Sequence, residues 1–236
     1  MAIYRLSSSS INRKSGRSAI AAAAYRSGVK LTDNENGKTH NYPLKKGVDD
    51  CFILLPESAS EKFNDREYLW NKIIASEKRI DAEEAKELQL ALPIELSYEQ
   101  KINLAKEFAQ KQFVDHGLAC DIAFHKMYSH NPHCHIMFTT RTIEGEDLNV
   151  KKARWIKPKS FLINQRKEWE ASVNKTFDEF GIDERITADS YKTMGLDIKG
   201  VDARFNKYDR EYVARIQSEN TEEVLNNIDY LATVLT

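Results

Sequence analysis

The sequence predicts an α+β fold in which a mainly antiparallel central sheet carries helices on one face. Short stretches that alternate polar and apolar residues, as half-buried strands do, are mixed irregularly with stretches whose apolar residues repeat at helical spacing. One face of the predicted sheet is apolar and the other carries histidines. No internal repeat or low-complexity linker interrupts the pattern, so we expect residues 1–200 to form one domain.

The first expected elements are a short strand at residues 2–6, a polar loop at residues 7–16 and a helix at residues 17–28. This helix is rich in alanine, the strongest helix former, and Gly28 supplies a stop signal.

Tyr25 lies in the last turns of this helix, next to Arg26. A tyrosine at the end of an alanine-rich helix is most often half-buried packing. Arg26 supports a second interpretation, since a nearby cation favours the phenolate and can also hold a phosphate.

The remaining elements follow from the same two periodicities. They are a polar hairpin or loop (31–50), strands (51–55, 87–92, 119–125 and 133–140) and helices (65–80, 97–117 with a capping box at Ser97 and Gln100, and 158–181). The last helix is the longest, and we expect it to cover the apolar side of the sheet. Residues 201–236 are expected to form a helical extension. The final LATVLT has no helix stop, which indicates truncation from a longer protein.

Three histidines are expected to meet on one sheet face. Side chains alternate along a strand, so His133 and His135 point the same way, and His125 lies on the polar face of the preceding strand. A hairpin with Asn131 and Pro132 as turn residues would bring His125 beside the other two. Three imidazoles suit a divalent metal and leave positions open for water or substrate, which is a catalytic arrangement.

Other interpretations of this region stay open. A lone histidine on a strand is more often structural than a metal ligand. His130 lies at the loop tip outside the alternation and is left out of the site. Cys120 and Cys134 fall on the apolar strand faces and are interpreted as core thiols, with Cys134 as an alternative ligand.

Glu87 begins a strand whose leucines alternate with polar residues. If those leucines share a core with Ile122 and Ile136, Glu87 comes within reach of the histidines. The alternative is an exposed glutamate on a half-solvated sheet.

Composition indicates a soluble globular protein, since 41% of the 236 residues are hydrophobic. No apolar run approaches the roughly 20 residues that span a bilayer, and the start MAIYRLSSSS lacks the features of a signal peptide. We therefore expect a cytoplasmic protein without membrane insertion. Three cysteines, an odd number, argue against a disulfide framework.

The net charge of −1 conceals two basic segments. Residues 1–48 carry nine Lys and Arg against two acids, and residues 151–167 carry seven against none. Such runs are often only solvated surface, but two of them around a metal site suit a phosphate backbone. The candidate DNA contacts are Arg17, Arg26, Lys151, Lys152, Arg154, Lys157 and Trp155. Trp155 has two interpretations, stacking on a base or packing in the core.

Four stretches, MAIYRL, AAAAYRSG, ELQLALP and HKMYSHNPHCHIMFTTR, together resemble the MobA/MobL-type relaxases of mobilisable and conjugative plasmids, within the HUH endonuclease superfamily. The resemblance covers about residues 1–190. It implies an HUH fold in which Tyr25 attacks the scissile phosphate at the transfer origin and forms a 5′-phosphotyrosine that is later religated. His125, His133 and His135 would be the metal ligands, and Glu87 a base or a partner of the metal site.

The resemblance also implies magnesium or manganese as the cofactor, although three imidazoles alone would favour zinc or nickel. The implied partners are single-stranded origin DNA with an adjacent hairpin, relaxosome accessory proteins and a type IV coupling protein, in the bacterial cytoplasm. A rolling-circle replication initiator is the nearest alternative, and Tyr25 preceding the histidines favours the relaxase. Tyr191 is the alternative nucleophile. A non-catalytic DNA-binding module with a structural metal is a third possibility.

Overall fold

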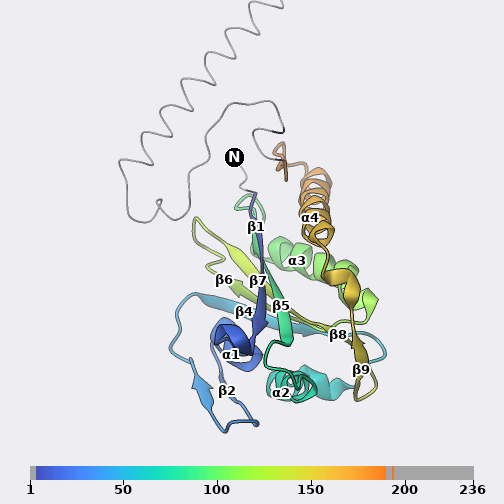
Figure 1. Ribbon diagram of the computed structural model, residues 1–236. Coiled ribbons are helices and arrows are strands. Elements are labelled where there is room, and N and C mark those ends of the chain that lie inside the picture. Colours follow the sequence, from blue (N-terminus) through green and yellow to red (C-terminus); the bar gives the residue numbers. More distant parts are fainter. Residues whose placement is uncertain (1–3, 190–192, 194–236) are drawn as a thin grey trace, which may run out of the picture. The chain divides into compact units, whose positions relative to one another are not determined.

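Five antiparallel strands form the central sheet in the order β1-β5-β7-β6-β4 (Figure 1). In that order they are β1 (Leu6–Asn12), β5 (Glu83–Ala91), β7 (His133–Thr139), β6 (Cys120–His125) and β4 (Val48–Leu54). The computed structural model describes residues 4–189 and 193. The chain divides into two compact units, Met1–Ala188 and Asp189–Thr236, and every helix and strand named below lies in the first.

Two small hairpins and four α-helices complete the described elements. The hairpins are β2 (Lys30–Thr32) with β3 (Thr39–Asn41), and β8 (Arg141–Glu144) with β9 (Asp147–Lys152). The helices are α1 (Ala19–Ser27), α2 (Arg66–Ser76), α3 (Tyr98–Gln112) and α4 (Lys159–Glu179), with short 3-10 turns η1 (Arg13–Ser15), η2 (Glu61–Asn64), η3 (Val114–His116) and η4 (Arg154–Ile156). Across the described residues, no helix is both long and apolar enough to cross a membrane.

The predicted hairpin between the two histidine-bearing strands is confirmed. His125 of β6 is paired with His133 of β7, and Ala123 with His135. On the other side of β7, His135 is paired with Gln89 of β5. The register places the histidines at one end of the sheet, where β6 ends and β7 begins.

Helices α3 and α4 cover one face of the sheet, as predicted for the apolar side. Their apolar side chains share one core with the even-numbered residues of the central strands. This core includes Leu88, Ile122, Phe124, Ile136, Phe138, Phe108, Phe161, Trp169 and Val173.

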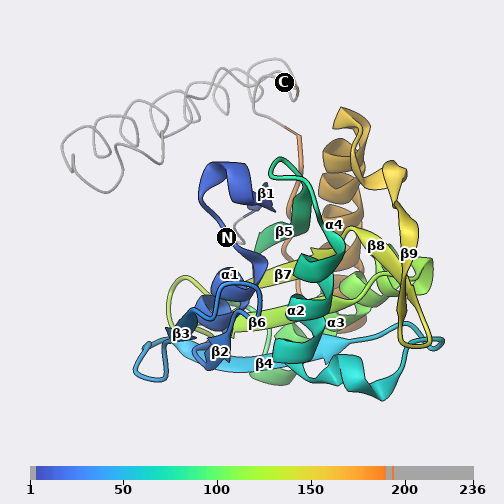
Figure 2. The same ribbon diagram turned by 60° about the horizontal axis from the view of Figure 1, so that its bottom comes forward.

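The α+β class with an antiparallel sheet is confirmed, with one difference: the helices are not confined to one face. Helices α1 and α2 pack on the face that bears the histidines, and Figure 2 shows them in front of the strands. This second core joins Ala85 and Met137 of the sheet, and Ala119 just before β6, to the apolar sides of both helices. The helix residues are Ile20, Ala23, Ala24, Leu69, Trp70 and Ile73. Because alanine occupies so many of these positions, α1 can lie close to the strands.

The prediction for residues 2–16 is wrong in its boundaries. The strand expected at 2–6 with a loop after it is instead β1, Leu6–Asn12, which includes the serine run. Ser9 pairs with Glu87 of β5, at the edge of the sheet. Backbone pairing with β5 holds these serines extended, and their lack of apolar alternation concealed the strand.

Several other boundaries agree closely with the predictions. However, β5 begins at Glu83, so Glu87, predicted to begin this strand, lies inside it, and α3 ends at Gln112, before the predicted stop at Gly117. Helix α1 begins after Ser18 and ends at Gly28, whose φ of 68° is left-handed and favours glycine. The capping box at Ser97 and Gln100 opens α3. Helix α2 ends at Ser76, before the predicted end. Residues 201–236, expected to form a helical extension, and Tyr191 lie outside the described residues.

Candidate metal centre and its tyrosine

The imidazoles of His125, His133 and His135 converge at the open end of the β6–β7 hairpin. Their ring centroids are 4.9 to 5.4 Å apart. One ring nitrogen from each lies within 4.8 Å of the others, which is close enough for a single metal ion. Within the part of the chain that the structure describes, these are the three residues that could hold a metal, so the predicted ligand set converges as the strand alternation requires.

Each imidazole is oriented by an acceptor on its other nitrogen. Nε2 of His125 lies 2.7 Å from the carbonyl oxygen of Arg26, and Nδ1 of His133 lies 2.9 Å from that of Asn131. Nδ1 of His135 lies 2.8 Å from Oε1 of Glu87. A carbonyl or carboxylate oxygen can only accept, so each of these nitrogens carries the hydrogen and the remaining nitrogen keeps its lone pair.

Electrostatics also favour neutral imidazoles. Burial lowers the pKa of His125 to about 4, despite its bond to the Arg26 carbonyl. Burial likewise lowers the pKa of His133. Neutral imidazole is the form that binds a metal, so this donor set fits a divalent cation.

Glu87 is buried between the histidine cluster and two arginines. Arg26 donates to it from Nε at 2.5 Å and from a terminal nitrogen at 3.0 Å, and Ser9 Oγ donates at 3.1 Å. Arg17 lies 3.7 Å away. Burial raises the pKa of this carboxyl, but the hydrogen bonds from His135 and Arg26 outweigh it and hold the pKa well below its usual range. Glu87 therefore reaches the histidine cluster, and its carboxylate is fully engaged there.

Arg26 connects the end of α1 to two of the three histidines. Its carbonyl oxygen holds His125, and its guanidinium holds Glu87, which in turn holds His135. At the other end of α1, the buried carboxylate of Glu84 accepts from the Ala19 backbone N–H at 2.8 Å. The helix is thus fixed at both ends against the strands that carry the site.

Tyr25, the residue before Arg26, is 44% exposed at this end of α1. The ammonium of Lys45 lies 3.8 Å from the centroid of its ring and donates to its carbonyl oxygen at 2.7 Å. Tyr42 meets the same ring edge-on, with centroids 5.3 Å apart. Neither Lys45 nor Tyr42 was predicted to lie beside Tyr25. The motif YPLKKG (42–47) offers only a lysine pair in a turn as a signal.

A family model of the MobA/MobL family matches residues 17–202. The chain belongs to the MobA/MobL family. It is 31% identical over 274 residues to a conjugal transfer protein TraA of Rhizobium radiobacter, covering 96% of the chain and 25% of that protein. It is 30% identical over 230 residues to a mobilization protein MobL of Acidithiobacillus ferridurans, covering 84% of the chain and 60% of that protein. The chain therefore spans only part of the length of these relatives.

A solved structure on the molecular basis of vancomycin resistance transfer in Staphylococcus aureus shares this fold. Its TM-score is 0.76 and its sequence identity is 33%, and the match covers 80% of the chain and all of that structure. The predicted resemblance to the MobA/MobL family is confirmed by the family model and by the mobilization protein MobL.

The second basic segment of this MobA/MobL chain lies beyond the opposite end of β7 from the histidines. Lys151, Arg154 and Lys157 are exposed. Lys152 is not a free cation, since its ammonium lies 3.0 Å from the buried carboxylate of Glu77. Trp155 is 41% exposed and also contacts the rings of His116 and Phe161, so part of it packs and part faces solvent.

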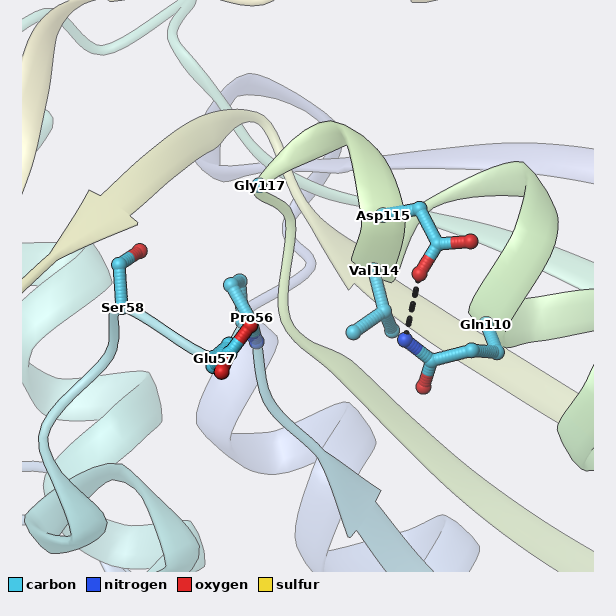
Figure 3. Close-up of a pocket in the computed structure, with 7 residues that line it drawn as sticks. All are labelled: Pro56, Glu57, Ser58, Gln110, Val114, Asp115 and Gly117. Atoms are coloured by element: carbon cyan, nitrogen blue, oxygen red, sulfur yellow. Dashed lines mark hydrogen bonds between the residues drawn. The ribbon is translucent and has the colours of Figure 1, made fainter.

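An open groove of about 600 Å³ lies elsewhere on the surface (Figure 3). It is lined by Pro56, Glu57, Ser58, Gln110, Val114, Asp115 and Gly117. Figure 3 shows Gln110 donating to Asp115, at 2.7 Å. The carboxylates of Glu57 and Asp115 line the groove and would repel a phosphate backbone. The groove lies near the start of β6, whereas His125 is at the end of that strand.

Proposed function

We propose that the protein is a relaxase that nicks one DNA strand at a transfer origin and later rejoins it. The observation that carries the proposal is the bond between His125 and the Arg26 carbonyl, because it ties the residue next to Tyr25 to the three-histidine cluster. The names of the relatives, conjugal transfer protein and mobilization protein, point to the same process.

Tyr25 is the proposed nucleophile. Its hydroxyl oxygen attacks the scissile phosphorus and expels the 3′-oxygen, leaving a 5′-phosphotyrosine, while the phenol proton passes to water and the 3′-oxygen gains a proton. The phosphodiester energy stays in the new bond, so the 3′-hydroxyl of a strand can reverse the step without a nucleotide cofactor. Tyr25 suits this role because it is partly exposed while Lys45 and Tyr42 restrict its ring.

His125, His133 and His135 would hold a divalent ion, for which we propose magnesium or manganese in the cell. When bound, the ion would neutralise charge on the non-bridging phosphate oxygens. The three histidines have their lone pairs free for it and their other nitrogens fixed by acceptors, which supports a preformed site.

For Glu87 we propose the role of metal-site partner. The contacts from Arg26 and His135 that keep its pKa low also make it a weak base. Its position supports orientation of His135, and water remains as the acceptor of the phenol proton.

The proposed substrate is single-stranded origin DNA with an adjacent hairpin. Arg17 and Arg26 lie beside the site, and Lys151, Arg154, Lys157 and the exposed part of Trp155 offer a second contact region. Strand β7, seven residues long, separates the two regions by roughly 20 Å at the usual rise per residue. Relaxosome accessory proteins and a coupling protein are proposed partners of the same complex.

The test is the covalent adduct. Wild-type protein, a labelled origin oligonucleotide and Mn²⁺ should give a labelled band that survives denaturing electrophoresis. Tyr25→Phe should bind the oligonucleotide with unchanged affinity and give no band, because one oxygen is missing. A band from Tyr25→Phe, or its loss only in Tyr191→Phe, would assign the nucleophile elsewhere and favour the replication-initiator alternative. Absence of cleavage by pure wild-type protein would leave a DNA-binding module.

A further inference from the structure

The connection from β3 to β4, residues 42–47, contacts both Tyr25 and the β6–β7 hairpin that carries the three histidines. It is pinned at both ends by backbone bonds: Tyr42 N–H donates to Val29 O at 3.3 Å, and Lys126 N–H donates to Gly47 O at 3.1 Å. Val29 follows α1, and Lys126 follows His125. Within this connection, Lys45 N–H donates to Tyr42 O at 3.0 Å and closes a turn. The position of the Lys45 side chain is therefore set by the same two elements that carry Tyr25 and His125.

We propose that Lys45 is a positioning residue for Tyr25, which holds the tyrosine in its attacking orientation and stabilises negative charge on the phenolic oxygen. This proposal rests on the proposed role of Tyr25. One ammonium contacts both the backbone and the ring of Tyr25, at 2.7 Å from the carbonyl oxygen and 3.8 Å from the ring centroid. Tyr42, from the same turn, meets the ring from its edge. The two contacts together restrict both the path of the helix end and the rotation of the ring.

A cation in this position acts on the chemistry in both directions. During attack, the phenolic oxygen loses its proton, and during religation it leaves phosphorus, so negative charge on it is stabilised by a neighbouring ammonium in either step. The guanidinium of Arg26 is further from the ring, 5.6 Å from its centroid, and is already bound to Glu87. Lys45 is therefore the nearer of the two cations to Tyr25.

The charge state of Lys45 supports the same role. Burial and, to a smaller extent, the positive charge of Arg26 on α1 lower the pKa of Lys45 to about 8, and Glu87 on β5 opposes the shift. The positive charge of this ammonium also acts on His125 of β6, whose pKa it lowers. The amine is thus charged at neutral pH and loses its charge as pH rises through about 8. An arginine at position 45 would remain charged throughout this range.

The experiment compares Lys45→Met, Lys45→Arg and the matched control Lys46→Met. Lys46 is the adjacent, exposed lysine of the same turn, so its removal changes the net charge equally. Single-turnover adduct formation is measured at saturating labelled origin oligonucleotide and Mn²⁺, and DNA affinity by fluorescence anisotropy. For Lys45→Met we expect the rate constant to fall at least about tenfold, as for a lost positioning contact, with affinity changed by less than about threefold. Lys46→Met should keep the wild-type rate constant, and Lys45→Arg should restore most of it.

A pH series adds a second measurement, in which a lysine with a purely structural role would have no effect. The ratio of the Lys45→Arg rate constant to that of wild type should be constant below pH 7 and rise above about pH 8, where only arginine stays charged. Taking a ratio cancels the titration of groups that both proteins share. At pH 7, where both side chains are charged, a Lys45→Arg rate constant as low as that of Lys45→Met would overturn the role of the charge.

The outcomes separate this inference from the proposed function. If Tyr25→Phe still forms the adduct, the proposed nucleophile is wrong whatever Lys45 does. If wild type reacts through Tyr25 and Lys45→Met reacts as fast, the inference alone is wrong. A Lys45→Met protein that loses DNA affinity but keeps its rate constant at saturation would make Lys45 a phosphate contact and overturn the positioning role. Should Lys45→Met fail to fold, the Lys45→Arg ratio still decides.

Discussion

Nε2 of His125 lies 2.7 Å from the backbone carbonyl oxygen of Arg26. This bond joins the last residue of β6 to the last turn of α1 across 99 positions of sequence. Since the carbonyl accepts the hydrogen, Nδ1 of His125 is the nitrogen left with a lone pair. The same bond holds the residue next to Tyr25. A candidate metal ligand and the candidate nucleophile are therefore positioned by one contact, which motivates the first prediction.

Replacing any one of His125, His133 and His135 by alanine should abolish measurable Mn²⁺ binding in titration calorimetry. Two imidazoles without a third are a poor site for a weakly bound divalent ion. His130→Ala is the matched control, because His130 lies exposed in the same hairpin. We expect it to bind Mn²⁺ like wild type, with the adduct yield following metal binding in all four variants. Retained Mn²⁺ affinity in the His135→Ala protein would place the ion elsewhere.

Glu87→Gln should lower the affinity for Mn²⁺ by about 10–100-fold, the usual range for a lost partner of a metal ligand. The amide cannot hold both Arg26 and Nδ1 of His135 as the carboxylate does. Glu84→Gln is the control, since Glu84 is equally buried on β5 but holds Arg13 and the start of α1. Glu84→Gln should lower the melting temperature, and it should lower the affinity for Mn²⁺ less than Glu87→Gln does. Equal affinity losses in the two variants would indicate general destabilisation.

Asp121→Ala should lower the free energy of unfolding by about 3–5 kcal/mol in urea denaturation, the range for breaking a buried ion pair. Asp121 accepts two hydrogen bonds from Arg66 and one from Trp70 Nε1, all within 2.9 Å. Removing it leaves a mostly buried guanidinium without its counter-charge. The exposed pair of Arg79 and Asp81 provides the comparison, and Arg79→Ala should change stability little. A small effect of Asp121→Ala would mean that Arg66 finds water or another acceptor.

In the second basic segment, the exposed Lys151, Arg154 and Lys157 should contribute to DNA affinity, whereas Lys152 should contribute to stability. Replacing each of the first three by glutamine should reduce the slope of log affinity against log salt by about 0.7–0.9 for single-stranded or duplex DNA. Lys152→Gln should instead lower thermal stability, because the buried carboxylate of Glu77 loses a partner. Anisotropy titrations at several salt concentrations, with melting curves, distinguish the two effects. If Lys152→Gln alone changed the salt slope, its assignment as structural would be wrong.

Trp155→Ala should weaken binding of single-stranded DNA by about 1–3 kcal/mol if its exposed part stacks on a base. Trp155 also touches His116 and Phe161, so melting curves must accompany the anisotropy measurement. Loss of stability with unchanged affinity would leave packing as its role.

The local periodicity of the sequence determined the histidine cluster. Alternation along residues 119–125 and 133–140 assigned His125, His133 and His135 to one face, and Asn131 and Pro132 indicated the turn that pairs them, as the register of β6 with β7 confirms. Helix α1 with its stop at Gly28 and the capping box at Ser97 were predictable for the same reason, since each depends on residues only a few positions apart.

Tertiary structure alone decided what surrounds that cluster. The serine run became β1 because β5 pairs with it. Three contacts join residues 20 to 75 positions apart: the ion pair of Arg26 with Glu87, the ion pair of Lys152 with Glu77, and the hydrogen bond from Lys45 to Tyr25. Such contacts depend on how whole elements pack against one another, and no local period or spacing in the chain carries that information.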